Sequence, residues 1–200
     1  QGGSGGQGGT GGNAGQGGQG GGAGGTGGAG GGSSVPQSGE VIITEIMFDP
    51  HNGLRDQFAE FIEIHNPGDN PFSLEDCVLS DGTADAPAGE VTIAPGGYVV
   101  YARSADTAAN GSLSVAGVFG FSLNNSRDLI SLTCGGRLVD QVRYDFDEGF
   151  PRARGFSMSL SPGQEAADSN DRAANWCFAR RVYLEDPIQW GTPGAANSPC

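Results

Sequence analysis

The chain has 200 residues, enough for one ordinary domain with a tail. It carries 23 acidic residues against 10 basic ones, all of them arginine, for a formal net charge of −13. Affinity for nucleic acids and anionic membranes depends on neutralising phosphates, so we expect no nucleic acid partner and no membrane contact by the folded part. No apolar run approaches the roughly 20 residues that a membrane-spanning helix needs.

The N-terminal segment is dominated by glycine, which supplies 21 of the first 32 residues. Such a segment cannot bury enough apolar surface to offset the entropy of ordering it. We therefore predict that residues 1–38 are a disordered linker or tether and that residues 39–200 form the folded domain. The chain begins at Gln1 with neither Met nor a signal peptide. An upstream lipid anchor would fit this tether, and a plain interdomain linker is the alternative.

Beyond the glycine tract the apolar residues mostly alternate with polar ones. This period of two, interrupted by Gly, Pro and Asn turn signals, is typical of short β-strands rather than helices. The pattern predicts an all-β sandwich or barrel. The candidate strands, in chain order, cover residues 40–48, 58–66, 72–80, 91–93, 97–104, 119–125, 127–134, 136–144, 155–162 and 175–181.

The second candidate strand contains acidic groups that could suggest catalysis. Ile62 and Ile64 alternate there with Glu63 and His65, which is the pattern of a strand with one solvated face. The pleat places Glu60 and Glu63 on opposite faces, so they should not converge as the carboxylate pair of a glycosidase. The chain also lacks a G-x-S-x-G serine elbow. We therefore predict no enzymatic role for Glu60, Glu63 or His65.

Two acidic segments, DFDEG (145–149) and DSND (168–171), are candidate calcium loops. Neither fits the twelve-residue EF-hand pattern, and Asp and Asn are also ordinary turn residues. The incomplete ligand sets favour solvated turns over a calcium site, and no other cofactor is expected. The carboxylates in question are those of Asp145, Asp147, Glu148, Asp168 and Asp171.

The four cysteines are Cys77, Cys134, Cys177 and Cys200, and no two form a C-x-x-C pair. Their even number and wide spacing favour two disulfides, hence an extracellular, cell-surface or periplasmic location. Three connectivities are available. We predict Cys77–Cys134, because both lie in apolar runs, and Cys177–Cys200, because this bond would close the C-terminal segment onto the body.

Several segments, in this order, resemble the lamin-tail domain of the bacterial extracellular kind. They are VIITEIMFDP, EFIEIHNPGDNPFSLEDCVLSDG, IAPGGYVVYARS, FGFSLNNSRDLISLTCGGRLVDQVRY, SMSLSPGQEAADSNDRAANWCFAR and WGTPGAANSPC. The resemblance covers about Gly39 to Cys200. It implies an immunoglobulin-like β-sandwich on an exported or cell-surface protein. Such domains are taken as binding or adhesion modules, and no catalytic residues are established for the family.

These observations together predict a non-catalytic extracellular or cell-surface module for binding, adhesion or scaffolding, held on a flexible tether. Its partner would be an unidentified protein or another envelope or extracellular ligand. The alternative is an accessory domain of an enzyme, or a metal-dependent hydrolase that uses the acidic loops. A hydrolase needs several acids or histidines converging in one cleft, whereas a binding module needs an exposed aromatic or apolar patch without that convergence.

Overall fold

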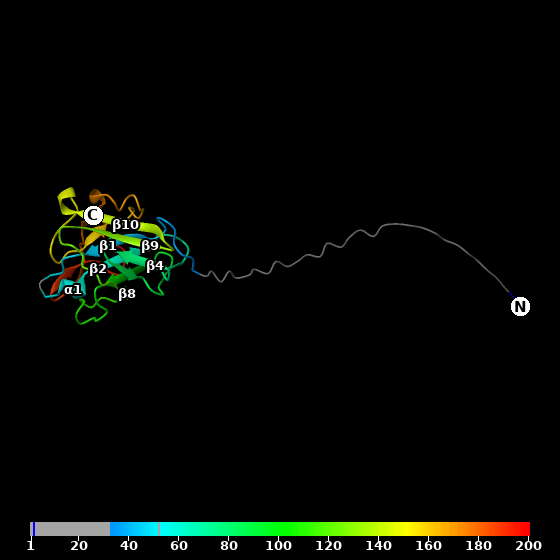
Figure 1. The fold of residues 1–200 in the computed structure, drawn as a ribbon, viewed down its shortest axis with the longest axis horizontal. Helices are drawn as coiled ribbons and strands as arrows, with labels where there is room; N and C mark the ends of the chain where they lie inside the picture. The colour runs from blue at the N-terminus through cyan, green and yellow to red at the C-terminus, as the bar shows by residue number, and fades with distance from the viewer. Residues whose placement is uncertain (1, 3–32, 52) are drawn as a thin grey trace. The chain divides into compact units, whose positions relative to one another are not determined.

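A computed structural model provides the structure of the chain, and it describes residues 2, 33–51 and 53–200 (Figure 1). Most of the predicted disordered linker, residues 1–38, lies outside the described residues. The last residues of that segment are bonded to the folded part. The backbone oxygen of Ser34 accepts a hydrogen bond of 2.8 Å from the amide of Ser73, and Arg137 donates to the side-chain oxygen of Gln37 at 2.9 Å.

Two β-sheets form the body of the folded part (Figure 1). The first sheet has six strands in the order β12 (Trp176–Phe178), β11 (Met158–Leu160), β1 (Ile42–Met47), β2 (Phe61–His65), β7 (Tyr98–Ala102) and β8 (Gly117–Val118). The second has four strands in the order β10 (Arg137–Asp145), β9 (Arg127–Cys134), β4 (Cys77–Ser80) and β5 (Asp85–Pro87). Within these sheets β7 and β8 pair in parallel, and the other pairs are antiparallel.

Shorter elements complete the described part of the chain. Two small two-stranded sheets pair β13 (Val182–Glu185) with β14 (Ile188–Trp190), and β3 (Phe72–Ser73) with β6 (Thr92–Ile93). The helical elements are single turns: α1 (Asp56–Ala59), η1 (Phe146–Glu148) and η2 (Ala173–Asn175). None of the described helices is long and apolar enough to cross a membrane.

The core contains the apolar residues that the alternation predicted to face inward. Ile62 and Ile64 of β2 are fully buried, as are Ile130 and Leu132 of β9, and all four belong to one cluster. Burial of each such side chain contributes about 1.5–3 kcal/mol. The fold is therefore an immunoglobulin-like β-sandwich, and the all-β prediction is confirmed.

The other face of the six-stranded sheet differs from the prediction. Glu63 has no exposed surface and His65 is only 7% exposed, so the predicted solvated face of β2 was wrong. The reason is that the C-terminal segment after β14 covers this face, where the amide of Gly194 donates to Glu63 at 2.7 Å. The ring of His65 stacks on that of Tyr98, with ring centroids 4.0 Å apart.

Both predicted disulfides are confirmed. Cys77 and Cys134 face each other on the neighbouring strands β4 and β9, with Cα atoms 4.0 Å apart. Cys177 on β12 is joined to Cys200, with Cα atoms 5.7 Å apart, which ties the end of the chain to an edge strand of the six-stranded sheet. The second bond therefore holds in place the same C-terminal segment that covers Glu63.

Candidate functional site

Glu45 and Glu63 form a pair of buried carboxyl groups on neighbouring strands. They are directly opposite each other in the register of β1 and β2, and neither has exposed surface. The hydroxyl of Ser157 donates to Glu45 at 2.5 Å and that of Ser159 at 3.2 Å. The amide of Thr192 adds a third hydrogen bond at 2.9 Å. Glu45 thus connects β1, β11 and the C-terminal segment.

Glu63 is held in the same manner from two sides. The hydroxyl of Thr44 lies 2.8 Å from one carboxyl oxygen, and the amide of Gly194 donates to the other at 2.7 Å. Burial raises the pKa of Glu45 to about 7. Burial, and then the charge of Glu45, raises the pKa of Glu63 well above its usual range. The pair is sealed beneath the C-terminal segment, so its hydrogen bonds are structural and no solvent reaches it.

Glu60 has a separate set of partners. It is 1% exposed, and its carboxylate lies 3.0 Å from the guanidinium of Arg103. It also accepts a hydrogen bond of 3.0 Å from the amide of Leu123. Burial raises the pKa of Glu60 to about 7, against the lowering effect of these two donors. Within the described part of the chain Glu60 and Glu63 share no hydrogen-bond or ion-pair partner, so the structure does not bring them together as a catalytic pair.

The two candidate calcium segments line different grooves. Asp145 and Glu148 line a groove of about 440 Å³. There Arg127 lies 3.5 Å from Asp145, which also accepts a hydrogen bond from the amide of Asp147 at the start of η1.

Asp168 and Asp171 line a second groove, of about 230 Å³, together with the buried Asp140. Burial raises the pKa of Asp171, and the charge of Asp168 adds to this effect. Within the described residues, no group of three His, Cys, Asp or Glu side chains is arranged to hold a metal ion. The expectation of solvated turns, with calcium binding as the alternative, stays a prediction from the sequence.

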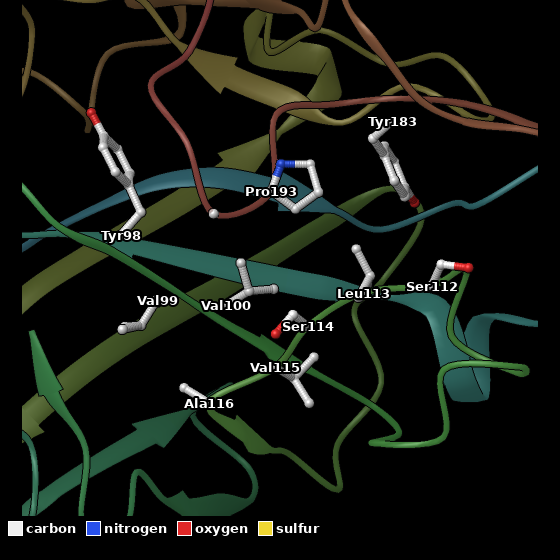
Figure 2. A pocket seen from close by; sticks show the side chains of 11 residues that line it. Tyr98, Val99, Val100, Ser112, Leu113, Ser114, Val115, Ala116, Tyr183 and Pro193 are labelled. Carbon is white, nitrogen blue, oxygen red and sulfur yellow. The ribbon is translucent and has the colours of Figure 1, made fainter.

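A groove of about 590 Å³, which we call the aliphatic groove, is lined by Val, Leu, Ala and Pro side chains together with two serines and two tyrosines (Figure 2). Tyr98 and Tyr183 stand on opposite sides of Pro193 in this view, and the side chains of Val100 and Leu113 lie beneath them. The buried hydroxyl of Tyr183 has no hydrogen-bond partner among the residues that the structure describes. No charged side chain lines this groove, so it offers hydrophobic contact without an electrostatic feature that would select a ligand.

A smaller groove, of about 310 Å³, is aromatic, and we call it the aromatic groove. Phe156, Phe178 and Trp190 line it, with Arg180 beside them. The rings of Phe156 and Trp190 stack with centroids 5.2 Å apart and planes 7° apart, and Phe178 meets Phe156 edge to face at 6.0 Å. Phe178 is 42% exposed, so aromatic surface is open to a ligand.

Sequence reasoning did not find the aromatic groove. Its aromatic residues come from the loop before β11, the end of β12 and the end of β14, and no periodicity links those positions. An isolated bridge between Phe156 and Trp190 brings the first and third together. The available signal was that aromatic residues stand in three short segments near the C-terminus that are otherwise rich in polar and turn residues.

These features define a disulfide-linked, immunoglobulin-like β-sandwich with buried structural acids and open apolar grooves. The chain matches the family described as Lamin Tail Domain over residues 34–146, more than half of its length, and it belongs to that family. Neither the curated proteins nor the solved structures compared with it contain a match. Strands β11 and β12 follow the matched residues, yet they lie in the same sheet as β1 and β2.

Proposed function

We propose that this chain is a non-catalytic extracellular or cell-surface module that binds a protein or an envelope or extracellular polymer. It would serve in adhesion, scaffolding or ligand display. The observation that carries the proposal is that three glutamate side chains are buried, whereas aromatic and aliphatic side chains line grooves at the surface. Glu45, Glu60 and Glu63 are buried and bonded to the fold, and none of them lines the grooves described above. Aromatic and aliphatic side chains line the two grooves without carboxylates.

The location is part of the same proposal. Two disulfides join all four cysteines of the chain, and disulfides persist mainly in oxidising compartments. The glycine-rich N-terminal segment, by its composition, would act as a tether between an upstream anchor and the folded part. The family and the disulfides support this proposal. Membership of the family gives no support to the alternative of a metal-dependent hydrolase.

A capture experiment tests the proposal. The full chain is immobilised and incubated with fractionated cell-envelope and extracellular material, and bound proteins and polymers are eluted and identified. The control is the same chain after reduction and unfolding, which presents the same charge without the folded surface. We expect at least one ligand that the folded chain retains saturably and the unfolded chain does not. Equal retention by both samples, or turnover of a substrate that Glu63→Gln abolishes with the fold intact, would show that the proposal is wrong.

A further inference from the structure

The aromatic groove differs in charge from the other grooves described above. Carboxylates line both grooves of the candidate calcium segments, one of which also has Arg127 and Arg143, and within the described part of the chain no charged side chain lines the aliphatic groove. Among the described residues, Arg180 lines the aromatic groove and no carboxylate side chain does. This is unusual for a chain with 23 acidic and 10 basic residues. Arg181 follows directly in the sequence and is also exposed. Neither arginine forms an ion pair with a carboxylate side chain among the described residues.

Arg180 also contacts the last residue of the sequence. The guanidinium of Arg180 donates to the backbone oxygen of Cys200, and Cys200 is bonded to Cys177, which itself lines the groove. A guanidinium has five N–H donors, so one hydrogen bond to the backbone leaves others for a ligand. Arginine binds planar carboxylates through paired hydrogen bonds.

The aromatic side chains supply a second, different kind of contact. Aromatic rings carry a partial negative charge on their faces, and the C–H groups on one face of a sugar ring carry a partial positive charge. Phe178 offers such a surface at the end of β12, beside the stacked pair of Phe156 and Trp190. Rings braced by neighbouring rings lose little conformational freedom when a ligand packs on them.

The size of the groove favours a compact unit over a protein surface. Its volume of about 310 Å³ lies at the lower end of the range for small-ligand sites, roughly 300–1,000 Å³. A stable protein interface, by contrast, buries about 800 Å² on each partner. An aromatic surface beside one cation therefore suits a single ring that carries a carboxylate.

We propose that the aromatic groove binds an acidic sugar unit, such as the uronic acid of an anionic polysaccharide. Phe178, with Phe156 and Trp190, packs against the sugar ring, and Arg180 pairs with its carboxylate. This inference rests on the proposed function, because it names the ligand class of a binding module. The overall negative charge of the chain limits the strength of binding.

Calorimetric titration of the full chain with short oligogalacturonates tests the inference, because these probes carry one carboxylate on each ring. The matched neutral probes are their methyl esters, which keep the ring and remove the charge. We expect saturable binding of the acidic probe that weakens as salt concentration rises, and at least tenfold weaker binding of the ester. Equal affinity for the two probes would overturn the assignment of Arg180.

Two variants and two controls locate the site. Phe178→Ala should weaken binding about 30-fold, as truncation of a central aromatic contact does. Arg180→Gln should remove the preference for the acidic probe over its ester. The controls are Val118→Ala, an exposed apolar residue on the opposite edge strand, and Arg143→Gln, an exposed arginine of β10. Both controls should leave the affinity unchanged, and equal losses in variants and controls would contradict the site.

The outcome also separates this inference from the proposed function. One outcome is that no oligogalacturonate binds, and that the folded chain captures another ligand which Phe178→Ala retains equally well. The acidic-sugar site is then wrong, and the binding-module proposal stands. If the folded chain captures no ligand of any class, the proposed function is wrong as well.

Discussion

The buried pair of Glu45 and Glu63 makes a specific prediction about the pH dependence of stability. The perturbation is Glu45→Gln, which keeps the shape of the side chain and removes its charge. The amide oxygen of the new side chain can accept the hydrogen bonds from Ser157, Ser159 and the amide of Thr192, and its NH2 group can donate to the hydroxyl of Thr192. The variant should therefore fold.

The magnitude follows from the pKa of Glu45, which rises from 4.5 to about 7 in the folded state. A raised pKa means that the folded state binds the proton more tightly than the unfolded state. The stabilising contribution is then fully present below pH 4.5 and is lost as pH rises through about 7. Each pKa unit corresponds to about 1.4 kcal/mol, so the loss is about 3 kcal/mol. The raised pKa of Glu63 acts in the same direction.

The assay is urea unfolding at several pH values between 5 and 8, with the disulfides intact. The free energy of unfolding of the native chain should fall by about 3 kcal/mol as pH rises because of Glu45 alone. Glu60 and Asp140 also have a pKa raised to about 7, so the total fall should be larger. In Glu45→Gln the fall should be smaller by about 3 kcal/mol.

A charge-matched control separates this effect from the general repulsion among 23 acidic residues. Glu75 is exposed, so Glu75→Gln changes the net charge by the same amount without touching the buried pair. Its pH profile should run parallel to that of the native chain. If Glu45→Gln also runs parallel, then the buried pair does not titrate in this range, and the reasoning is refuted.

Three further predictions concern the ion pair, the disulfides and the acidic loops. Glu60→Ala should cost about 3 kcal/mol in urea unfolding, because it leaves the buried side of Arg103 without its carboxylate, and a loss under 1 kcal/mol would contradict this. Removing the Cys77–Cys134 disulfide, which spans 57 residues of sequence, should lower the free energy of unfolding by about 4 kcal/mol. Removing the Cys177–Cys200 disulfide, which spans 23, should lower it by about 3 kcal/mol, because a shorter loop restricts the unfolded chain less. Millimolar calcium should raise the melting temperature no more than magnesium does, and a calcium-specific rise lost in Asp168→Asn would establish a calcium site.

Most of the strands and both disulfides could be predicted from the sequence because their signals are local. The candidate strand at residues 119–125 was wrong, since the described residues include no strand between β8 and β9, and β5, β13 and β14 were not predicted. Alternation of Ile62 and Ile64 with polar residues fixes the orientation of β2, and the two apolar runs around Cys77 and Cys134 predict neighbouring strands. The same alternation failed for Glu63. It shows that Glu63 lies on the other face of the sheet, but cannot show that Gly194, 131 residues later, covers it.

The burial of Glu45 had a faint sequence signal. Ser159 of β11 and Ser157, which directly precedes this strand, are two residues apart, so they face the same side, toward Glu45 on the neighbouring strand β1. Small hydroxyl residues in alternation next to a glutamate-bearing strand are suitable donors for a buried carboxyl group. That pairing becomes visible only when the strand order is known, because β1 and β11 are far apart in the sequence.

The aromatic groove could not be predicted for a related reason. Phe156, Phe178 and Trp190 belong to three elements, and each of them alone reads as an ordinary surface or core aromatic residue. Only the bridge between Phe156 and Trp190 and the edge position of β12 bring them to one place. Grooves at the junction of several elements depend on tertiary structure, whereas single strands depend mainly on local pattern.

The central claim is that the folded chain binds a ligand and leaves it chemically unchanged. The most direct measurement is the mass and length distribution of the captured ligand after prolonged incubation with the folded chain. The reference is the same ligand incubated with the reduced, unfolded chain. The account predicts saturable retention by the folded chain and identical distributions in the two samples. A ligand that is shortened or modified only by the folded chain would contradict it.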